Sequence, residues 1–361
     1  MPWVLTGTFT EAEVESMRDR GAEVTESRRY DPLLAPLDRV FRPLPSHPHS
    51  MADVMKHINA PAAWAKARGK GVHIAIIDTG ICGRLNEFPT AKRSKFQWVR
   101  KGGDAWTDPR RHGSMTAAVA AATTAGGGRY DGVAPDATVI SCKAPSFDET
   151  DLFRIYDFLL SLVKTGKIGR LVTNNSYGAY TCRPVTPARQ LAAIIRQAVA
   201  EGIVTVFAAG NNHVSMCRGV ATDCTPNTIW GLNSFDEVLS VGTVNQQDRM
   251  SDAPLVPNAF SHRDSSRGPG EHAVATSKPD CVAPTYGEVV WGCGYQAMEW
   301  WGTSGAAPQV AGLAALILEL KPSLSATEVY DVIRNSCVDI GLGATCAGRG
   351  RIDCAAALQG L

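Results

Sequence analysis

Apolar and polar positions along the chain fall into two kinds of run. Short, continuous apolar runs, such as VHIAIID and IVTVFAA, are typical of strands buried on both faces of a parallel sheet. Longer segments with helical periodicity or many alanines separate them. The predicted strands are 72–78, 138–142, 171–174, 203–209 and 238–244, and the predicted helices are 113–124, 152–163, 188–200, 305–320 and 325–336. This alternation predicts right-handed βαβ units and a three-layer α/β/α fold with a mainly parallel central sheet.

Residues 1–50 do not follow this pattern. A short strand-like stretch at 3–8 leads into a charged helix candidate at 10–20, and five prolines follow before residue 50. We therefore predict an N-terminal extension and linker at 1–50 and a single domain at 51–361. Within that domain, the stretch 212–300 is rich in Asn, Ser, Asp and Gly and predicts long loops around a site.

The composition limits the classes of partner. The 361 residues are 44% hydrophobic, which is enough for a large core. Lys and Arg number 36 against 35 Asp and Glu, a net charge of +1, and no basic cluster indicates a nucleic-acid or membrane-surface partner. We saw no uncharged apolar run close to the ~18 residues that span a bilayer.

The start of the chain and its cysteines bear on location. The first residues turn acidic and lack a basic segment followed by an apolar one, so we expect a cytoplasmic protein; a leader ahead of Met1 would instead imply secretion. The ten cysteines would suit disulfides in a secreted protein, but in the cytoplasm buried free thiols are the expected state. No CxxC pair occurs, and we predict no metal ligand.

Three residues suited to nucleophilic catalysis lie at the ends of predicted elements. Asp78 ends the strand at 72–78, while His112 and Ser304 each precede a helix. A serine hydroxyl, an imidazole that takes its proton and a carboxylate that orients the imidazole together form a catalytic triad. Taken singly, each residue has a plainer interpretation as a turn or helix cap.

Asn211 follows the strand at 203–209, where its amide could donate to an oxyanion; an asparagine in a left-handed turn is the plainer interpretation.

The order of Asp78, His112 and Ser304 along the chain is more informative. An α/β-hydrolase needs a histidine after its serine, but the last histidine, His272, precedes Ser304. The chymotrypsin order begins with His and needs an all-β fold. The order Asp, His, Ser is the one found in subtilisin.

From about residue 50 to its end, the chain resembles the subtilisin family of serine peptidases. The matching segments are INAPAAWAKARGKGVHIAIIDTGI (58–81), RHGSMTAAVAA (111–121), DGVAPDATVISCKA (131–144), NNSYG (174–178), FAAGNN (207–212), SSRGP (265–269), KPDCVAP (278–284) and GTSGAAPQVAGLAAL (302–316). The resemblance implies a triad of Asp78, His112 and Ser304, with Asn211 at the oxyanion. It also implies a substrate-binding cleft made of Ser176, Tyr177 and Gly178, which pair with the substrate backbone, and of Ala208, Ala209 and Gly210.

The block 58–81 is most similar to the intracellular branch of the family. Members of that branch carry a short N-terminal extension that blocks the cleft until it is removed, so residues 1–50 could make the chain a zymogen. Two alternatives are a shortened form of the chaperone-like propeptide of secreted members and an inert tail.

The chain departs from the family pattern in several places. Met115 and Gln309 replace histidines near the triad, and Gly305 replaces the methionine after the nucleophile. Cys82 replaces an acidic calcium ligand, and the loop 123–132 lacks the usual Asn-rich calcium pattern. We therefore expect no cofactor for catalysis, and a structural calcium only if these altered sites still bind it.

The function expected from the resemblance is a serine endopeptidase acting on peptides or proteins through an acyl-enzyme. Two alternatives stay open: a processing or defence protease that cuts one partner protein, and an impaired pseudoprotease that only binds peptides. The acidic run at 147–151 could favour basic substrates or could simply begin a helix. The sequence does not predict the oligomeric state.

Overall fold

A six-stranded parallel sheet forms the centre of the computed structural model, which describes residues 5, 7–27, 31–32, 43–214, 217, 224, 226–250, 262–275 and 277–361. The strand order is β4-β3-β5-β7-β8-β9. The strands are β3 (His73–Asp78), β4 (Thr138–Lys143), β5 (Leu171–Asn175), β7 (Val204–Ala208), β8 (Leu239–Val244) and β9 (Cys281–Pro284). All five predicted strands are present, and β9 is a sixth that the sequence analysis placed in loops.

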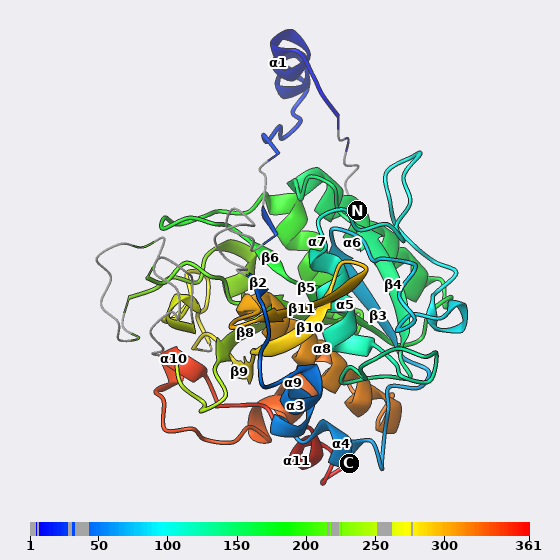
Figure 1. The fold of residues 1–361 in the computed structure, drawn as a ribbon. Coiled ribbons are helices and arrows are strands. Elements are labelled where there is room, and N and C mark those ends of the chain that lie inside the picture. The colour runs from blue at the N-terminus through cyan, green and yellow to red at the C-terminus, as the bar shows by residue number, and fades with distance from the viewer. Residues whose placement is uncertain are drawn as a thin grey trace.

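Helices cover both faces of this sheet (Figure 1). Alternate residues of β3 divide between two cores: Ile74 and Ile76 belong to one cluster, and Ala75 and Ile77 to the other. The first cluster is covered by α5 (His112–Ala121), α8 (Gly302–Leu320) and α9 (Ala326–Asn335), and the second by α6 (Glu149–Lys164) and α7 (Arg189–Ala200). The predicted three-layer α/β/α fold is confirmed.

Helix α8 is the central helix of the first layer. Its small residues let it approach α5 closely: a Cβ added at Gly312 would lie 2.5 Å from the Val133 side chain and 2.9 Å from the Ala120 carbonyl oxygen. Within the described part of the chain, α8 is the one helix long and apolar enough to cross a membrane, but 89% of its apolar window is buried inside the protein. This burial is that of a core helix in a globular domain.

Two smaller sheets flank the central one. In the first, β1 (Asp31–Pro32) pairs antiparallel with β6 (Tyr177–Gly178). In the second, the hairpin of β10 (Gly287–Trp291) and β11 (Gly294–Met298) pairs with β2 (Pro43–Leu44). The prediction of loops at 212–300 is wrong for this hairpin, whose two-residue turn begins with a glycine, as tight hairpin turns often do.

The remaining elements are short. They are α1 (Glu11–Asp19), α3 (Met51–His57), α4 (Ala60–Ala63), α10 (Ala344–Ala347), α11 (Cys354–Ala357) and the 3₁₀ turns η1 (Thr90–Lys92), η2 (Gly231–Ser234) and η3 (His262–Asp264). The helix predicted at 10–20 is confirmed as α1, none of whose residues 11–19 is buried, and which stands away from the body at the top of Figure 1. The strand-like stretch at 3–8 lies largely outside the described residues.

The expectation of free thiols is wrong for six of the ten cysteines. Disulfides join Cys82 to Cys293, Cys182 to Cys217 and Cys224 to Cys346, across 211, 35 and 122 residues of sequence. Free thiols remain at Cys142, Cys281, Cys337 and Cys354. The pairs are distant in the sequence and meet only in the folded chain.

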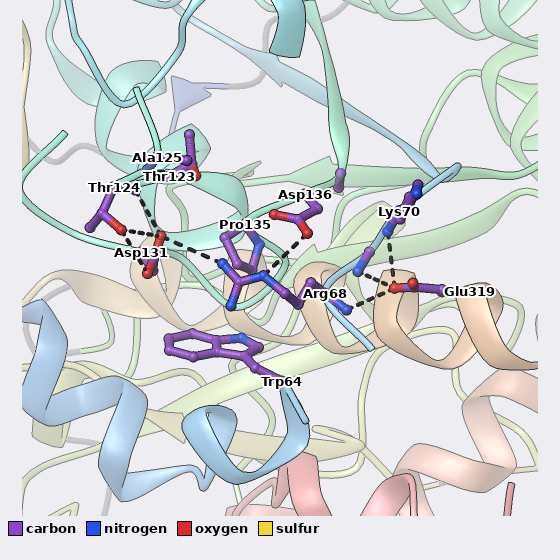
Figure 2. Close-up of polar contacts among 12 residues, drawn as sticks. Trp64, Arg68, Lys70, Thr123, Thr124, Ala125, Asp131, Pro135, Asp136 and Glu319 are labelled. Atoms are coloured by element: carbon purple, nitrogen blue, oxygen red, sulfur yellow. Dashed lines mark hydrogen bonds and ion pairs between the residues drawn. The ribbon is translucent and has the colours of Figure 1, made fainter. Parts of the chain in front are cut away.

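One carboxylate fastens the far end of α8 to the start of β3 (Figure 2). Glu319 Oε2 accepts hydrogen bonds from the backbone N–H groups of residues 68, 69 and 70, at 2.7, 2.6 and 3.0 Å. Beside it, the Arg68 guanidinium lies 5.3 Å from the Trp64 ring and pairs with Asp136 at 3.1 Å. The turn that leads into β3 is therefore held by the last turn of α8.

Replacing Glu319 by glutamine should destabilise the fold. The amide oxygen can still accept hydrogen bonds, but the negative charge that strengthens three of them is lost, at a cost of about 2 kcal/mol. Urea unfolding followed by circular dichroism measures this loss. The control is Glu201→Gln, because Glu201 makes a surface ion pair with Lys164 at 3.2 Å, with both side chains 40% exposed, and should change stability little. Equal stability of the two variants would contradict the role of Glu319.

Candidate active site

Two of the predicted catalytic side chains are in direct contact. Asp78 is the last residue of β3 and His112 the first of α5, and His112 Nδ1 lies 2.7 Å from Asp78 Oδ1. The side chains are fully buried, as is Ser304. An ionised carboxylate only accepts hydrogen bonds, so Nδ1 carries the proton and Nε2 is the nitrogen that can accept one.

Further groups fix the Asp78 carboxylate. Its Oδ1 accepts the backbone N–H of Thr79 at 2.7 Å, and its Oδ2 accepts the hydroxyl of Thr116 at 3.2 Å. The sequence analysis missed Thr116. Its position four residues after His112, on the same face of a helix, was the signal that could have identified it.

The start of α5 packs tightly against the loop after β3. A Cβ added at Gly113 would lie 2.1 Å from the Gly80 carbonyl oxygen, so only glycine fits after His112. Asp108 connects the two segments: it accepts from the Thr79 hydroxyl at 2.7 Å and from the N–H and hydroxyl of Ser114 at 2.8 and 2.7 Å. Burial raises the pKa of the Asp108 carboxyl.

Ser304 occupies the first turn of α8. Its Oγ lies 3.4 Å from the Ser176 carbonyl oxygen, and the Ser176 hydroxyl donates to the Ser304 carbonyl at 3.0 Å. The N–H groups of a first helical turn have no partner within the helix, and the helix dipole makes this end positive. A negative charge that develops beside Ser304 would therefore be stabilised.

Asn211 faces the same turn of α8. Its Oδ1 accepts the backbone N–H and the hydroxyl of Thr303, at 3.0 and 2.9 Å. This pairing turns the amide nitrogen toward Gly302, where an added Cβ would lie 3.0 Å from Nδ2. Gly302 has φ +67°, a conformation that favours glycine. Thr303 orients Asn211, which the sequence analysis did not foresee.

The two replaced histidines have local explanations. Met115 is fully buried in the core that α5 shares with α8. Gln309 is also buried, and its amide donates to the carbonyl oxygens of Pro284 at 2.7 Å and Gly305 at 3.0 Å. Each residue thus supports the fold near the site without an imidazole.

The acidic run at 147–151 gives no support to a preference for basic substrates. Asp148 and Asp151 both pair with Arg100 at 2.9 Å, and Asp148 also caps α6. Glu149 accepts the backbone N–H of Ala188 at 2.7 Å. These contacts fit the interpretation that the acidic run simply begins helix α6.

Cys82 and the loop 123–132, which the resemblance connects with calcium, make contacts within the protein. Cys82 is joined in a disulfide. In the loop 123–132, Asp131 accepts the Thr124 N–H at 2.8 Å, and nearby Glu87 accepts the Arg129 N–H at 2.9 Å. No group of three or more His, Cys, Asp or Glu residues able to hold a metal ion occurs among the described residues.

The chain thus combines a parallel sheet between two helix layers with a buried Asp–His pair and a serine in the first turn of a helix. The profile of the subtilase family (peptidase S8) matches residues 69–350, so the chain belongs to that family. Mycosin-4 of Mycobacterium tuberculosis is 31% identical over 324 residues, 82% of this chain and 66% of mycosin-4. Subtilisin DY of Bacillus licheniformis is 28% identical over 294 residues, 81% of this chain and 92% of that protein.

Solved structures agree with this fold. A crystal structure of MycP1 with its N-terminal propeptide removed superposes with a TM-score of 0.66 at 24% identity, covering 85% of this chain and 96% of that one. MycP1 from the ESX-1 type VII secretion system gives 0.64 at 21% identity, covering 93% and 97%. The chain spans 66% and 70% of the length of mycosin-4 and mycosin-3, respectively.

The expected cytoplasmic location is wrong. The chain is similar to mycosins, and MycP1 is described as part of a secretion system. Three disulfides are also unusual in a reducing cytoplasm. Both observations point away from a plain cytoplasmic location.

The disulfide between Cys82 and Cys293 bears directly on the site. It joins the loop after Asp78 to the turn of the β10–β11 hairpin, and in the same turn the Gly292 N–H donates to the Arg111 carbonyl at 3.2 Å. The hairpin turn thus contacts the chain just after Asp78 and just before His112.

Removing this disulfide should loosen the Asp78–His112 pair. We expect the double variant Cys82→Ser, Cys293→Ser to lose about 2–4 kcal/mol of stability and to react more slowly with a fluorophosphonate probe. Thermal unfolding and labelling kinetics measure the two effects. The control is Cys337→Ser, at a partly buried free thiol. A double variant that unfolds and reacts like this control would show that the disulfide does not support the site.

Proposed function

We propose that this subtilase hydrolyses peptide bonds through Asp78, His112 and Ser304. The observation that carries the proposal is the buried 2.7 Å contact between His112 Nδ1 and Asp78 Oδ1 at the carboxyl end of β3. This edge of a parallel sheet is where ligands bind in open α/β folds. The family membership supports the same class of reaction.

In the proposed reaction, Ser304 Oγ attacks the scissile carbonyl carbon and His112 Nε2 takes its proton. Asp78 stabilises the imidazolium that forms, and Asn211 Nδ2 with the Ser304 N–H holds the oxyanion. Collapse of the tetrahedral intermediate transfers the proton to the leaving amine and leaves an acyl-enzyme, which water then hydrolyses. No cofactor takes part in these steps.

The proposed substrate is a peptide or protein segment in an extended conformation. Its backbone would pair with Ser176–Gly178 as an added strand, with Ala208–Gly210 on the opposite side of the first side-chain pocket. Main-chain pairing of this kind gives affinity with little sequence preference, so selectivity must come from the pockets.

Changing Ser304 to alanine should abolish covalent labelling by a fluorophosphonate, because no nucleophile remains at the site. Mass spectrometry of the labelled protein measures this and locates the label. The matched control, Ser323→Ala, alters an exposed serine just beyond α8 and should label like the parent. A label that persists in Ser304→Ala would identify another nucleophile.

We further propose that residues 1–50 form a segment distinct from the peptidase domain and occupy the cleft before activation. Support comes from β1, whose Asp31 and Pro32 pair antiparallel with Gly178 and Tyr177, the residues expected to bind the substrate backbone. The full burial of Ser304 agrees with an occupied cleft. The chain would then be a zymogen.

Cutting the extension in the folded protein should increase the reactivity of Ser304. A recognition sequence for a site-specific protease, placed at 36–41, allows the cut after folding, so the domain need not fold without its extension. We expect labelling to be at least about tenfold faster after the cut, because a competing strand has been released. Protein with a scrambled recognition sequence is the control. Unchanged labelling after a complete cut would contradict the blocking role.

A further inference from the structure

Asn233 bridges the two walls of the proposed side-chain pocket. It lies in η2, and its Nδ2 donates to the Tyr177 carbonyl oxygen at 2.8 Å and to the Ala208 carbonyl oxygen at 2.6 Å. Tyr177 belongs to the wall formed by Ser176–Gly178, and Ala208 begins the opposite wall. A single buried amide therefore closes the gap between them.

The orientation of this amide is determined by its neighbours. Both groups that face Nδ2 are carbonyl oxygens, so the reversed orientation would place three acceptors together. Asn233 is only 2% exposed, and no donor among the described residues reaches its Oδ1. A buried acceptor without a donor is costly, which makes it a candidate contact for a ligand.

The Asn233 amide also occupies the space that a side chain at position 178 of β6 would need. A Cβ added at Gly178 would lie 2.8 Å from Asn233 Nδ2 and 3.1 Å from Oδ1. The neighbouring η2 backbone is held in place by Glu271, which accepts the Gly231 N–H at 2.8 Å and the Val185 N–H at 2.8 Å. Asn233 therefore has little freedom to move aside.

The bridging amide also lies close to the nucleophile along the wall. Ser304 Oγ lies 3.4 Å from the Ser176 carbonyl oxygen. The next carbonyl, that of Tyr177, is already bonded to Asn233, and consecutive residues are only about 3.8 Å apart. The amide that closes the gap is therefore bonded to the residue directly after the one that lies beside the nucleophile.

We propose that Asn233 sets the specificity of the reaction for a small P1 side chain, where P1 is the substrate residue whose carbonyl is attacked. Alanine and serine fit beside the amide, and the serine hydroxyl can donate to Asn233 Oδ1. Leucine and phenylalanine would have to displace the amide from both carbonyls. This inference rests on the proposed function and names the class of substrate it takes.

The test compares peptide anilides that differ only at P1, with Ala, Ser, Leu or Phe, on the full chain after its extension has been cut. We expect kcat/KM for P1 Ala to exceed that for P1 Phe by at least about tenfold, the discrimination that a filled apolar site gives. Asn233→Ala removes the amide and should shift this ratio at least about tenfold toward Phe and Leu. Because the ratio is taken within each variant, a general loss of activity cancels.

The control is Asn227→Ala. Asn227 also bonds backbone groups, at Ile229 (3.1 Å) and Gly270 (2.9 Å), but neither wall of the pocket, so its P1 ratio should equal that of the parent. A parent that cleaves P1 Phe as well as P1 Ala, or an unchanged ratio in Asn233→Ala, would overturn the proposal. Fluorophosphonate labelling distinguishes failure of the specificity from failure of the proposed function. If the parent is labelled but shows no P1 preference, the specificity alone is refuted. If the parent is not labelled, the proposed function is refuted, and this inference with it.

Discussion

The position of α8 is the constraint on which the site depends. This helix is buried along most of its 19 residues, and Glu319 at its far end binds the three N–H groups of the turn that enters β3. An α-helix rises about 1.5 Å per residue, so Ser304 lies about 22 Å from Glu319 along a rigid rod. The end of α8 is therefore fixed at the turn that enters β3, and the rigidity of the helix carries this constraint to its first turn at Ser304.

The groups at that edge hold one another through links between different elements. Thr116 of α5 orients Asp78 of β3, and Thr303 of α8 orients Asn211 after β7. Such pairing between elements places each polar atom without relying on a mobile loop. It also satisfies buried polar groups that would otherwise be costly in a water-poor site. Support of this kind is compatible with the two replaced histidines, because Asp78 and His112 remain in contact without them.

The sequence was sufficient for whatever follows from local periodicity and chain order. Buried parallel strands have continuous apolar runs, so the sheet, its helices and the residues at the strand ends could be predicted. The disulfides could not, because Cys82 and Cys293 meet only after the hairpin has folded against the loop beyond β3. The role of Asn233 was equally hidden: its significance comes from two carbonyls, more than 20 residues away on either wall, that converge on it only in three dimensions.

Two separate selections then act on a polypeptide that approaches this cleft. In the proposed function, pairing with Tyr177 and Gly178 selects for an extended backbone, whatever its sequence, and Asp31–Pro32 of the extension pair there from within the same chain. The Asn233 amide selects by side-chain size, one residue farther along the same wall. The two proposed selections are physically coupled, because the backbone of β6 would pair with the substrate and its Tyr177 carbonyl is bonded to Asn233. A side chain that displaces Asn233 from that carbonyl would therefore also disturb the strand proposed to bind the substrate. A bulky side chain is therefore rejected through lost hydrogen bonds as well as through lack of space.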